Sequence, residues 1–235
     1  MITKPAAISR RSALRGAAAG LGGVLLTAGA TGCTAQGTDA MPSGDDAPSP
    51  GAAVPGQDGR RVLLACFSRA GENYHYGGRT KLDVGNTEIL AGMVSALIPC
   101  DVHRIEAAEP YPESYDATVA RNVREQDQDA RPAILNPLAA VGRYDTVILA
   151  SGIWNVRAPM IMATFAESYD FTGKTILPLT THAMSGLGTT VRDYRQSCPG
   201  ATIGEGLAVK GEEVRNAGPG VGSWLQRAGL LPARR

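Results

Sequence analysis

The stretch "CFSRAGENYHYGGRTKLDVGNTEIL", residues 66–90, begins like the end of a buried strand and finishes like the start of a helix. Between these two ends the chain is rich in glycine, hydroxyl and amide residues. The first N–H groups of a helix have no partner within the helix, and the helix dipole favours negative charge at that end. A polar loop between a strand and a helix therefore predicts an anion-binding site.

Composition restricts both the class of fold and the class of ligand. The chain has 235 residues, of which 43% are hydrophobic, and this suits one globular α/β domain. The formal net charge is +1, but residues 1–33 contain four basic residues and no acidic one, so the remainder has 19 basic and 22 acidic residues. Nucleic-acid binding would require a basic excess and is not expected.

The first 33 residues have the features of an export signal. The paired arginines Arg10 and Arg11 precede the apolar run "AAAGLGGVLLTAGA", residues 17–30, which is too short and too rich in glycine for a membrane-spanning helix. This arrangement resembles a twin-arginine signal, which a receptor reads. The sequence "ATGC" that ends at Cys33 resembles a bacterial lipoprotein cleavage site, although leucine is more usual where Ala30 stands.

We therefore expect residues 1–33 to be a twin-arginine, lipoprotein-type signal and the protein to be extracytoplasmic. A lipid on Cys33 would be its only attachment to a membrane. The alternative is that Cys33 is an unmodified thiol in a discarded peptide. Residues 34–59 are rich in Gly, Pro, Ala, Ser and Asp and have no apolar period, so they predict a disordered tether. The folded domain is expected to span residues 60–235.

Apolar strands alternate with helices throughout this domain. We expect strands at residues 61–67, 101–107, 144–152, 174–181 and 201–211. We expect helices at residues 86–98, 110–131, 158–169, 186–198 and 212–229, the last interrupted by Gly218 and Pro219. Five strands alternating with helices predict a parallel, doubly wound sheet with helices on both faces. Ligands of such sheets bind at the carboxyl ends of the strands.

Three loops leave those strand ends with unusual residues. The first is the opening stretch, in which Ser68, Asn86 and Thr87 would stand beside the free N–H groups of a helix. This loop lacks the frame G-x-x-x-x-G-K-S/T and a usable G-x-G-x-x-G, which disfavours an NTP-hydrolysing P-loop and a classical dinucleotide fold. The second loop, "SGIWNVRAPM", contains Trp154, for which a ligand contact and a lid over the core are both open. The third is "TTHAMSGLG", residues 180–188.

At these loops the chain resembles the flavodoxin family. The family's phosphate loop has the form S/T-x-T-G-N-T after the first strand, and here Ser68 matches its first position. The closing G-N-T is matched by Gly85, Asn86 and Thr87. Ala70 replaces a hydroxyl residue, and residues 72–84 interrupt the loop. The interrupted loop is similar to that of a flavodoxin-like branch common in bacteria, as are the second and third loops, and the likeness extends over residues 61–214.

The resemblance implies a sheet of five parallel strands in the order 2-1-3-4-5 and FMN as a noncovalent cofactor. Ser68, Asn86, Thr87 and the loop amides would bind its phosphate, and Trp154 would pack against the isoalloxazine ring. The implied cofactor-binding residues are Ser68, Arg69, Ala70, Gly85, Asn86, Thr87, Gly152, Ile153, Trp154, Asn155, Thr181, His182, Ser185 and Gly186. Many flavodoxins have a stacking tyrosine in the third loop, where this chain has His182 and Met184.

The function implied is that of a flavoprotein that passes electrons through FMN, either as a carrier or as a reductase of quinones or other small acceptors. Its partners would be FMN and a redox partner or small electron acceptor. Twin-arginine export agrees with this, since that route is associated with proteins that load their cofactor before transport. The alternative is a flavin-free flavodoxin-fold lipoprotein that binds another anion or a protein.

Other readings of the same residues are less favoured. A serine hydrolase around His182 is disfavoured because G-x-S-x-G is absent, and three scattered histidines make no metal site. Tyr74, His75, Tyr76 and Arg79 could fold over the cofactor, but a solvated flap is preferred. Cys66 is expected to be inert within the first strand, and an exported protein could pair the other two domain cysteines, Cys100 and Cys198.

Overall fold

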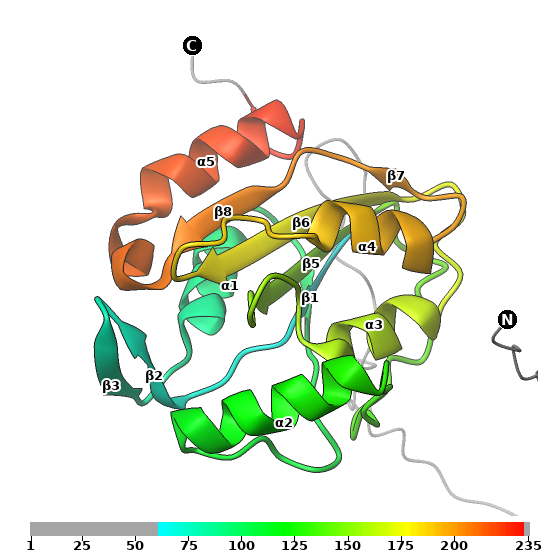
Figure 1. Ribbon diagram of the computed structural model, residues 1–235. Helices are drawn as coiled ribbons and strands as arrows, with labels where there is room; N and C mark the ends of the chain where they lie inside the picture. Colours follow the sequence, from blue (N-terminus) through cyan, green and yellow to red (C-terminus); the bar gives the residue numbers. More distant parts are fainter. Residues whose placement is uncertain (1–60, 233–235) are drawn as a thin grey trace, which may run out of the picture. The chain divides into compact units, whose positions relative to one another are not determined.

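The computed structural model describes residues 61–232 (Figure 1). The expected signal at residues 1–33, including Cys33, and the expected tether at residues 34–59 lie outside this range, so both remain predictions. None of the helices within residues 61–232 is long and apolar enough to cross a membrane.

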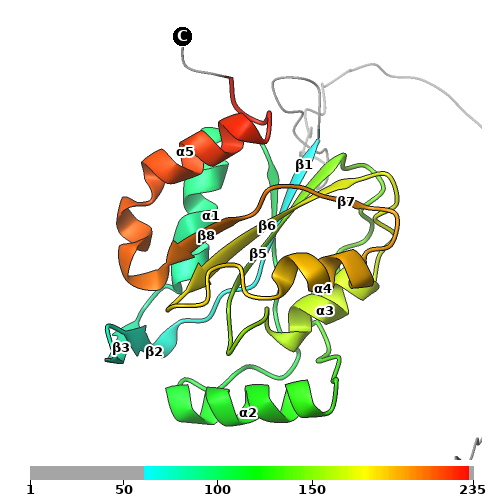
Figure 2. The same ribbon diagram turned by 45° about the horizontal axis from the view of Figure 1, so that its top comes forward.

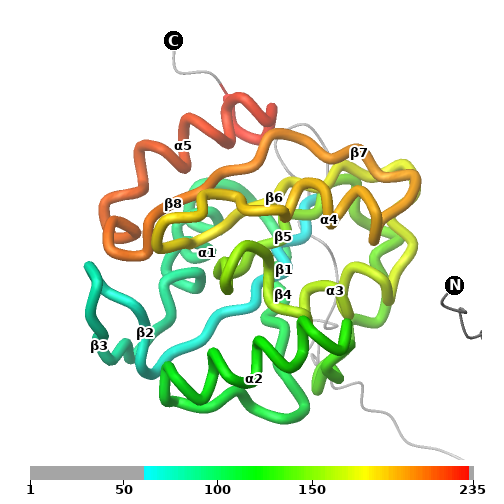
Figure 3. The backbone as a smooth tube through the Cα atoms, in the orientation of Figure 1, coloured from blue at the N-terminus to red at the C-terminus, as the bar shows by residue number. Residues whose placement is uncertain are grey.

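A parallel sheet forms the centre of the described part. Its strands are β1 (Val62–Cys66), β4 (Asp101–Arg104), β5 (Thr146–Gly152), β6 (Thr175–His182), β7 (Thr202–Ile203) and β8 (Leu207–Lys210). They lie in the order β4-β1-β5-β6, and both β7 and β8 pair with β6 (Figure 3). This is the order 2-1-3-4-5, so the expected doubly wound fold is confirmed.

Two apolar clusters sandwich this sheet, because successive residues of a strand point to opposite faces. Leu63 and Ala65 pack with α3 (Met160–Glu167) and α4 (Thr190–Ser197). The neighbouring side chains of β1 pack on the other face with α1 (Asn86–Leu97) and α5 (Gly218–Arg227). The side chains of β1 are therefore buried on both faces of the sheet, which explains the continuous apolar run that predicted this strand.

Helix α2 (Tyr115–Asp127) differs from the other helices because its buried residues are all polar. These residues are Thr118, Arg121, Asn122 and Glu125. The helix packs beside α3 and β2 rather than within either apolar layer, and Figure 2 shows it at the end of the sheet where β5 and β6 finish. The helix predicted within residues 110–131 begins at Tyr115, behind its proline-rich entry as expected, and ends at Asp127.

The expected fifth strand at 201–211 was wrong as a single element, because it is divided into β7 and β8. At Gly204, which lies between them, an added Cβ would lie 2.6 Å from a methyl group of the Leu177 side chain, so a larger residue there requires Leu177 to shift. The expected last helix is also divided: the 3₁₀ helix η1 (Gly211–Asn216) ends before α5, and Pro219 lies in the first turn of α5.

The segment between β1 and α1 is a regular antiparallel hairpin of β2 (Gly71–His75) and β3 (Gly78–Leu82), and His75, Tyr76 and Arg79 are exposed, as the preferred solvated flap requires. Its turn residues are exposed, but Tyr74 is half-buried.

The cysteines of the described part are free thiols. Cys100 packs with the α1/α5 cluster and Cys198 with the α3/α4 cluster, so the sheet lies between them and the pairing is not made. Burial raises the pKa of the Cys66 thiol to about 12, which makes this thiol inert as expected.

Candidate functional site

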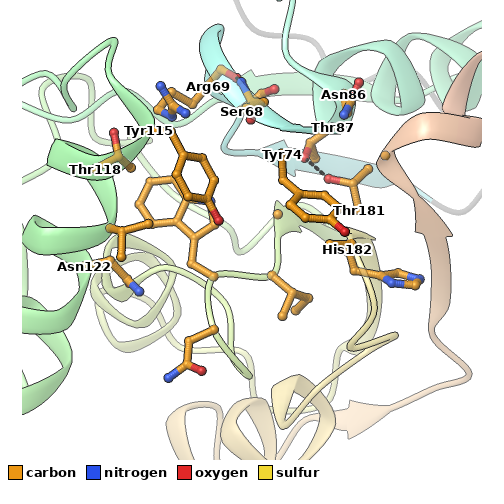
Figure 4. A pocket seen from close by; sticks show the side chains of 18 of the residues that line it. Ser68, Arg69, Tyr74, Asn86, Thr87, Tyr115, Thr118, Asn122, Thr181 and His182 are labelled. Carbon is orange, nitrogen blue, oxygen red and sulfur yellow. Dashed lines mark hydrogen bonds between the residues drawn. The ribbon is translucent and has the colours of Figure 1, made fainter. Parts of the chain in front are cut away.

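A cavity of about 470 Å³ opens at the carboxyl ends of β1, β5 and β6 (Figure 4). The three polar loops singled out in the sequence meet there, together with α2 and the hairpin. Ten of the fourteen residues expected to bind a cofactor line it: Ser68, Arg69, Asn86, Thr87, Gly152, Ile153, Trp154, Asn155, Thr181 and His182. The structure therefore brings together residues that are up to 114 positions apart in the chain.

The remaining four expected residues do not line the cavity. Ala70 is exposed, and Gly85 is buried behind Ser68 at the start of α1. The hydroxyl of Ser185 donates to the Asn155 carbonyl at 3.1 Å, and the Gly186 carbonyl accepts from Thr180 at 3.1 Å. The latter two residues therefore brace the second loop and β6 instead of facing the cavity.

The N-terminus of α1 lies where the opening stretch predicted an anion site. The Ser68 hydroxyl accepts the Glu88 N–H at 3.1 Å, and the Gly85 carbonyl accepts the same group at 3.0 Å. The N–H groups of Asn86 and Thr87 have no acceptor among residues 61–232. Free N–H groups at a helix N-terminus bind anions because the helix dipole adds to their partial charges.

A buried hydroxyl pair joins this helix end to the third loop. The Thr87 and Thr181 hydroxyl oxygens lie 2.7 Å apart, and both residues line the cavity. One hydroxyl donates to the other, which leaves one hydroxyl hydrogen of the pair for a ligand. That Thr87 itself donates to a phosphate remains a prediction.

Arg69 lines the cavity, but carbonyl groups occupy its guanidinium. It donates to the carbonyls of Pro112 and Glu113, each at 3.0 Å, and to that of Glu72. Burial lowers its pKa, and these three acceptors compensate for the loss of water. The side chain therefore ties the first loop to the entrance of α2.

Trp154 combines the two roles that its position in the sequence left open. Its ring makes edge contacts with Phe67, at 5.7 Å between centroids, and with Tyr111, at 5.0 Å. Its backbone N–H donates to the Arg157 carbonyl at 2.9 Å, which closes a tight turn. The residue caps the core and also forms one wall of the cavity.

The third loop contributes His182, but Met184 is 82% exposed and does not line the cavity. Burial, and then the charge of Lys210, lower the pKa of His182, so the imidazole is neutral at pH 7. The Ser185 hydroxyl is bonded to a backbone carbonyl and not to this imidazole. This geometry contradicts the serine-hydrolase alternative, which requires a bond between the two side chains.

Most residues of one wall of the cavity were not among the cofactor-binding residues expected from the sequence. Helix α2 contributes Tyr115, Thr118, Val119, Asn122 and Val123, and the hairpin contributes Asn73 and Tyr74, of which Tyr74 had been considered as a cover of the cofactor but not preferred. The other missed residues are Phe67, Ala183, Gly211 and Glu212. The helical spacing of the α2 residues places them on one face, and this spacing was the available sequence signal.

A doubly wound sheet with a cavity at its strand ends, next to a free helix N-terminus, defines the class of α/β proteins that bind phosphate-bearing ligands at this edge. Within that class the chain belongs to the flavodoxin family, because the family model Flavodoxin_4 matches residues 82–227, more than half of the chain.

Two solved structures from Bacteroides are similar to the chain. A protein of Bacteroides eggerthii is 25% identical, with a TM-score of 0.55, and the match covers 72% of this chain and 97% of that one. A protein of Bacteroides uniformis is also 25% identical, with a TM-score of 0.56 and coverage of 71% and 98%. Both are described provisionally as flavoproteins. A comparison with curated protein sequences finds no match.

Proposed function

We propose that this protein binds FMN noncovalently and transfers electrons through it. The observation that carries the proposal is the free N-terminus of α1 at one end of an aromatic-walled cavity. FMN matches both features. Its phosphate is an anion, which suits the helix N-terminus, and its ring is flat and largely apolar, which suits the aromatic wall. The volume of about 470 Å³ also lies within the range typical of cofactor sites. Membership of the flavodoxin family and the two similar proteins, which are described provisionally as flavoproteins, support a flavin cofactor.

Different residues would bind the phosphate and the ring of FMN. Ser68, Asn86 and Thr87 would hold the phosphate, whose charge the helix N-terminus offsets without a free basic side chain. Trp154 would orient the ring, since its own position is set by Phe67 and Tyr111. Bound FMN supplies the redox chemistry, and the protein supplies position and electrostatics. The electrons would pass to a redox partner or to a small acceptor such as a quinone.

The proposal predicts that the protein, produced in a bacterial cytoplasm, purifies yellow with about one FMN per chain. The absorbance spectrum and chromatography of the released flavin measure this directly. A colourless protein that also fails to bind added FMN would contradict the proposal. That result would favour the flavin-free alternative, in which the same helix N-terminus binds another anion or a protein, without changing the fold.

We also propose that the protein is exported through the twin-arginine route and anchored by a lipid on Cys33. Changing Arg10 and Arg11 to lysine is then expected to leave a folded precursor in the cytoplasm, because the paired arginines are what the receptor reads. Cell fractionation measures this. Cys33→Ala should still be exported but should lose incorporation of labelled fatty acid. Normal export of the double-lysine variant would argue for another route.

A further inference from the structure

The third loop provides no Phe, Tyr or Trp side chain to the cavity. Met184, the large apolar residue of that loop, points into solvent, and Ala183 lines the cavity beside His182. A flat ligand held against Trp154 would therefore find no Phe, Tyr or Trp partner on the third loop.

We propose that Tyr74, on the hairpin β2–β3, supplies this second aromatic wall. Figure 4 shows the rings of Tyr74 and Tyr115 pointing into the cavity. The inference rests on the proposed function, because the ligand against which Tyr74 would stack is the flavin ring.

Ring contacts distinguish Tyr74 from the other aromatic residues of the cavity. Phe67 and Trp154 contact each other, and the guanidinium of Arg79 lies 3.7 Å from the ring centre of Tyr115. None of the described residues makes such a contact with Tyr74. Its phenol also has no hydrogen-bond partner within residues 61–232. No aromatic ring or guanidinium of the described part therefore stacks on Tyr74, and offset stacking is the geometry that flat aromatic systems prefer.

The hairpin is fixed on both sides of Tyr74. On one side, the Glu72 carboxylate accepts the Tyr115 N–H at 2.9 Å, and the Glu72 N–H donates to the Glu113 carbonyl at 2.9 Å. On the other side, the Tyr76 N–H donates to Glu212 Oε1 at 3.0 Å. These bonds connect the hairpin to the start of α2 and to η1, and Figure 1 shows the hairpin next to both elements. In the chain, Tyr74 lies between the bonded residues Glu72 and Tyr76. Its position over the cavity is therefore set before a ligand binds.

The test compares Tyr74→Leu, Tyr74→Phe and the matched control Tyr76→Leu by fluorescence titration with FMN and with riboflavin. Tyr76 is on the same hairpin but 71% exposed, and only its backbone contacts Glu212. We expect Tyr74→Leu to weaken both flavins by about 3- to 10-fold, because the lost contact is with the ring that they share. Tyr74→Phe and Tyr76→Leu should bind like the parent protein.

Hydrogen exchange of the parent protein provides a second measurement that needs no variant. Bound FMN is expected to slow exchange of the amides of residues 72–76. Parent-like affinity of Tyr74→Leu for both flavins, or no protection of these amides, would overturn the inference while the parent still binds FMN. A parent protein that binds neither flavin would instead contradict the proposed function and this inference with it.

Discussion

Gly85→Ala is expected to remove tight FMN binding and to leave the fold intact. An added Cβ would lie 2.2 Å from Ser68 Oγ and 2.6 Å from the Arg69 carbonyl oxygen. Both distances are too short, and the carbonyl belongs to the backbone, so the first loop must move. Ser68 would then lose its place beside the N-terminus of α1. If two charge-assisted hydrogen bonds to the FMN phosphate are lost, at about 1.5 kcal/mol each, FMN should bind roughly 100-fold more weakly.

Titration with FMN and with riboflavin separates the possible causes. Riboflavin has the same ring but no phosphate, so its affinity should change much less than that of FMN. Equal losses for both flavins would mean that the moved loop distorts the whole cavity. Unchanged FMN affinity would mean that the phosphate is bound elsewhere.

Gly92→Ala is the matched control because it adds the same methyl group within α1, the helix that Gly85 precedes. Nothing lies within 4 Å of the added Cβ, and the residue is exposed. Alanine favours a helix interior over glycine by about 1 kcal/mol, so this variant should be as stable as the parent protein or more so. It should bind FMN normally.

Trp224→Ala is expected to lower the free energy of unfolding by about 3–5 kcal/mol, the usual cost of truncating a buried aromatic residue. Trp224 is 0% exposed within the α1/α5 cluster, and its indole N–H donates to the Glu205 carbonyl at 2.8 Å. Urea unfolding of the flavin-free protein, followed by circular dichroism, measures the change.

The exposed Tyr76, changed to alanine, controls for the loss of an aromatic side chain and should cost less than about 0.5 kcal/mol. A loss below about 1 kcal/mol for Trp224→Ala would contradict the packing described for α5. Because Trp224 does not line the cavity, the folded variant should still bind FMN normally, which separates stability from binding.

The sequence by itself determined the architecture and the location of the site. Runs such as "VLLAC" in β1 and "VILA", residues 147–150, in β5 are apolar without interruption because both faces of these strands are buried. Alternation of such strands with helices leaves few topologies, and the carboxyl ends of parallel strands must share one edge. The start of α1 at Asn86 was also predictable, since a strand, a glycine-rich loop and an apolar helical period follow one another.

Only the tertiary structure decided which surfaces complete the cavity. Periodicity tells which face of an element is buried, but not which other element covers it. The buried face of α2 is polar, so its sequence reads like a solvent-exposed helix, yet Asn122 and Thr118 line the cavity. Glu72 joins the hairpin to Tyr115, 43 residues away, and Thr87 meets Thr181, 94 residues away. Such hydrogen bonds depend on distances in space and leave no periodic trace in the sequence, so the wall that they build appears only when the chain is folded.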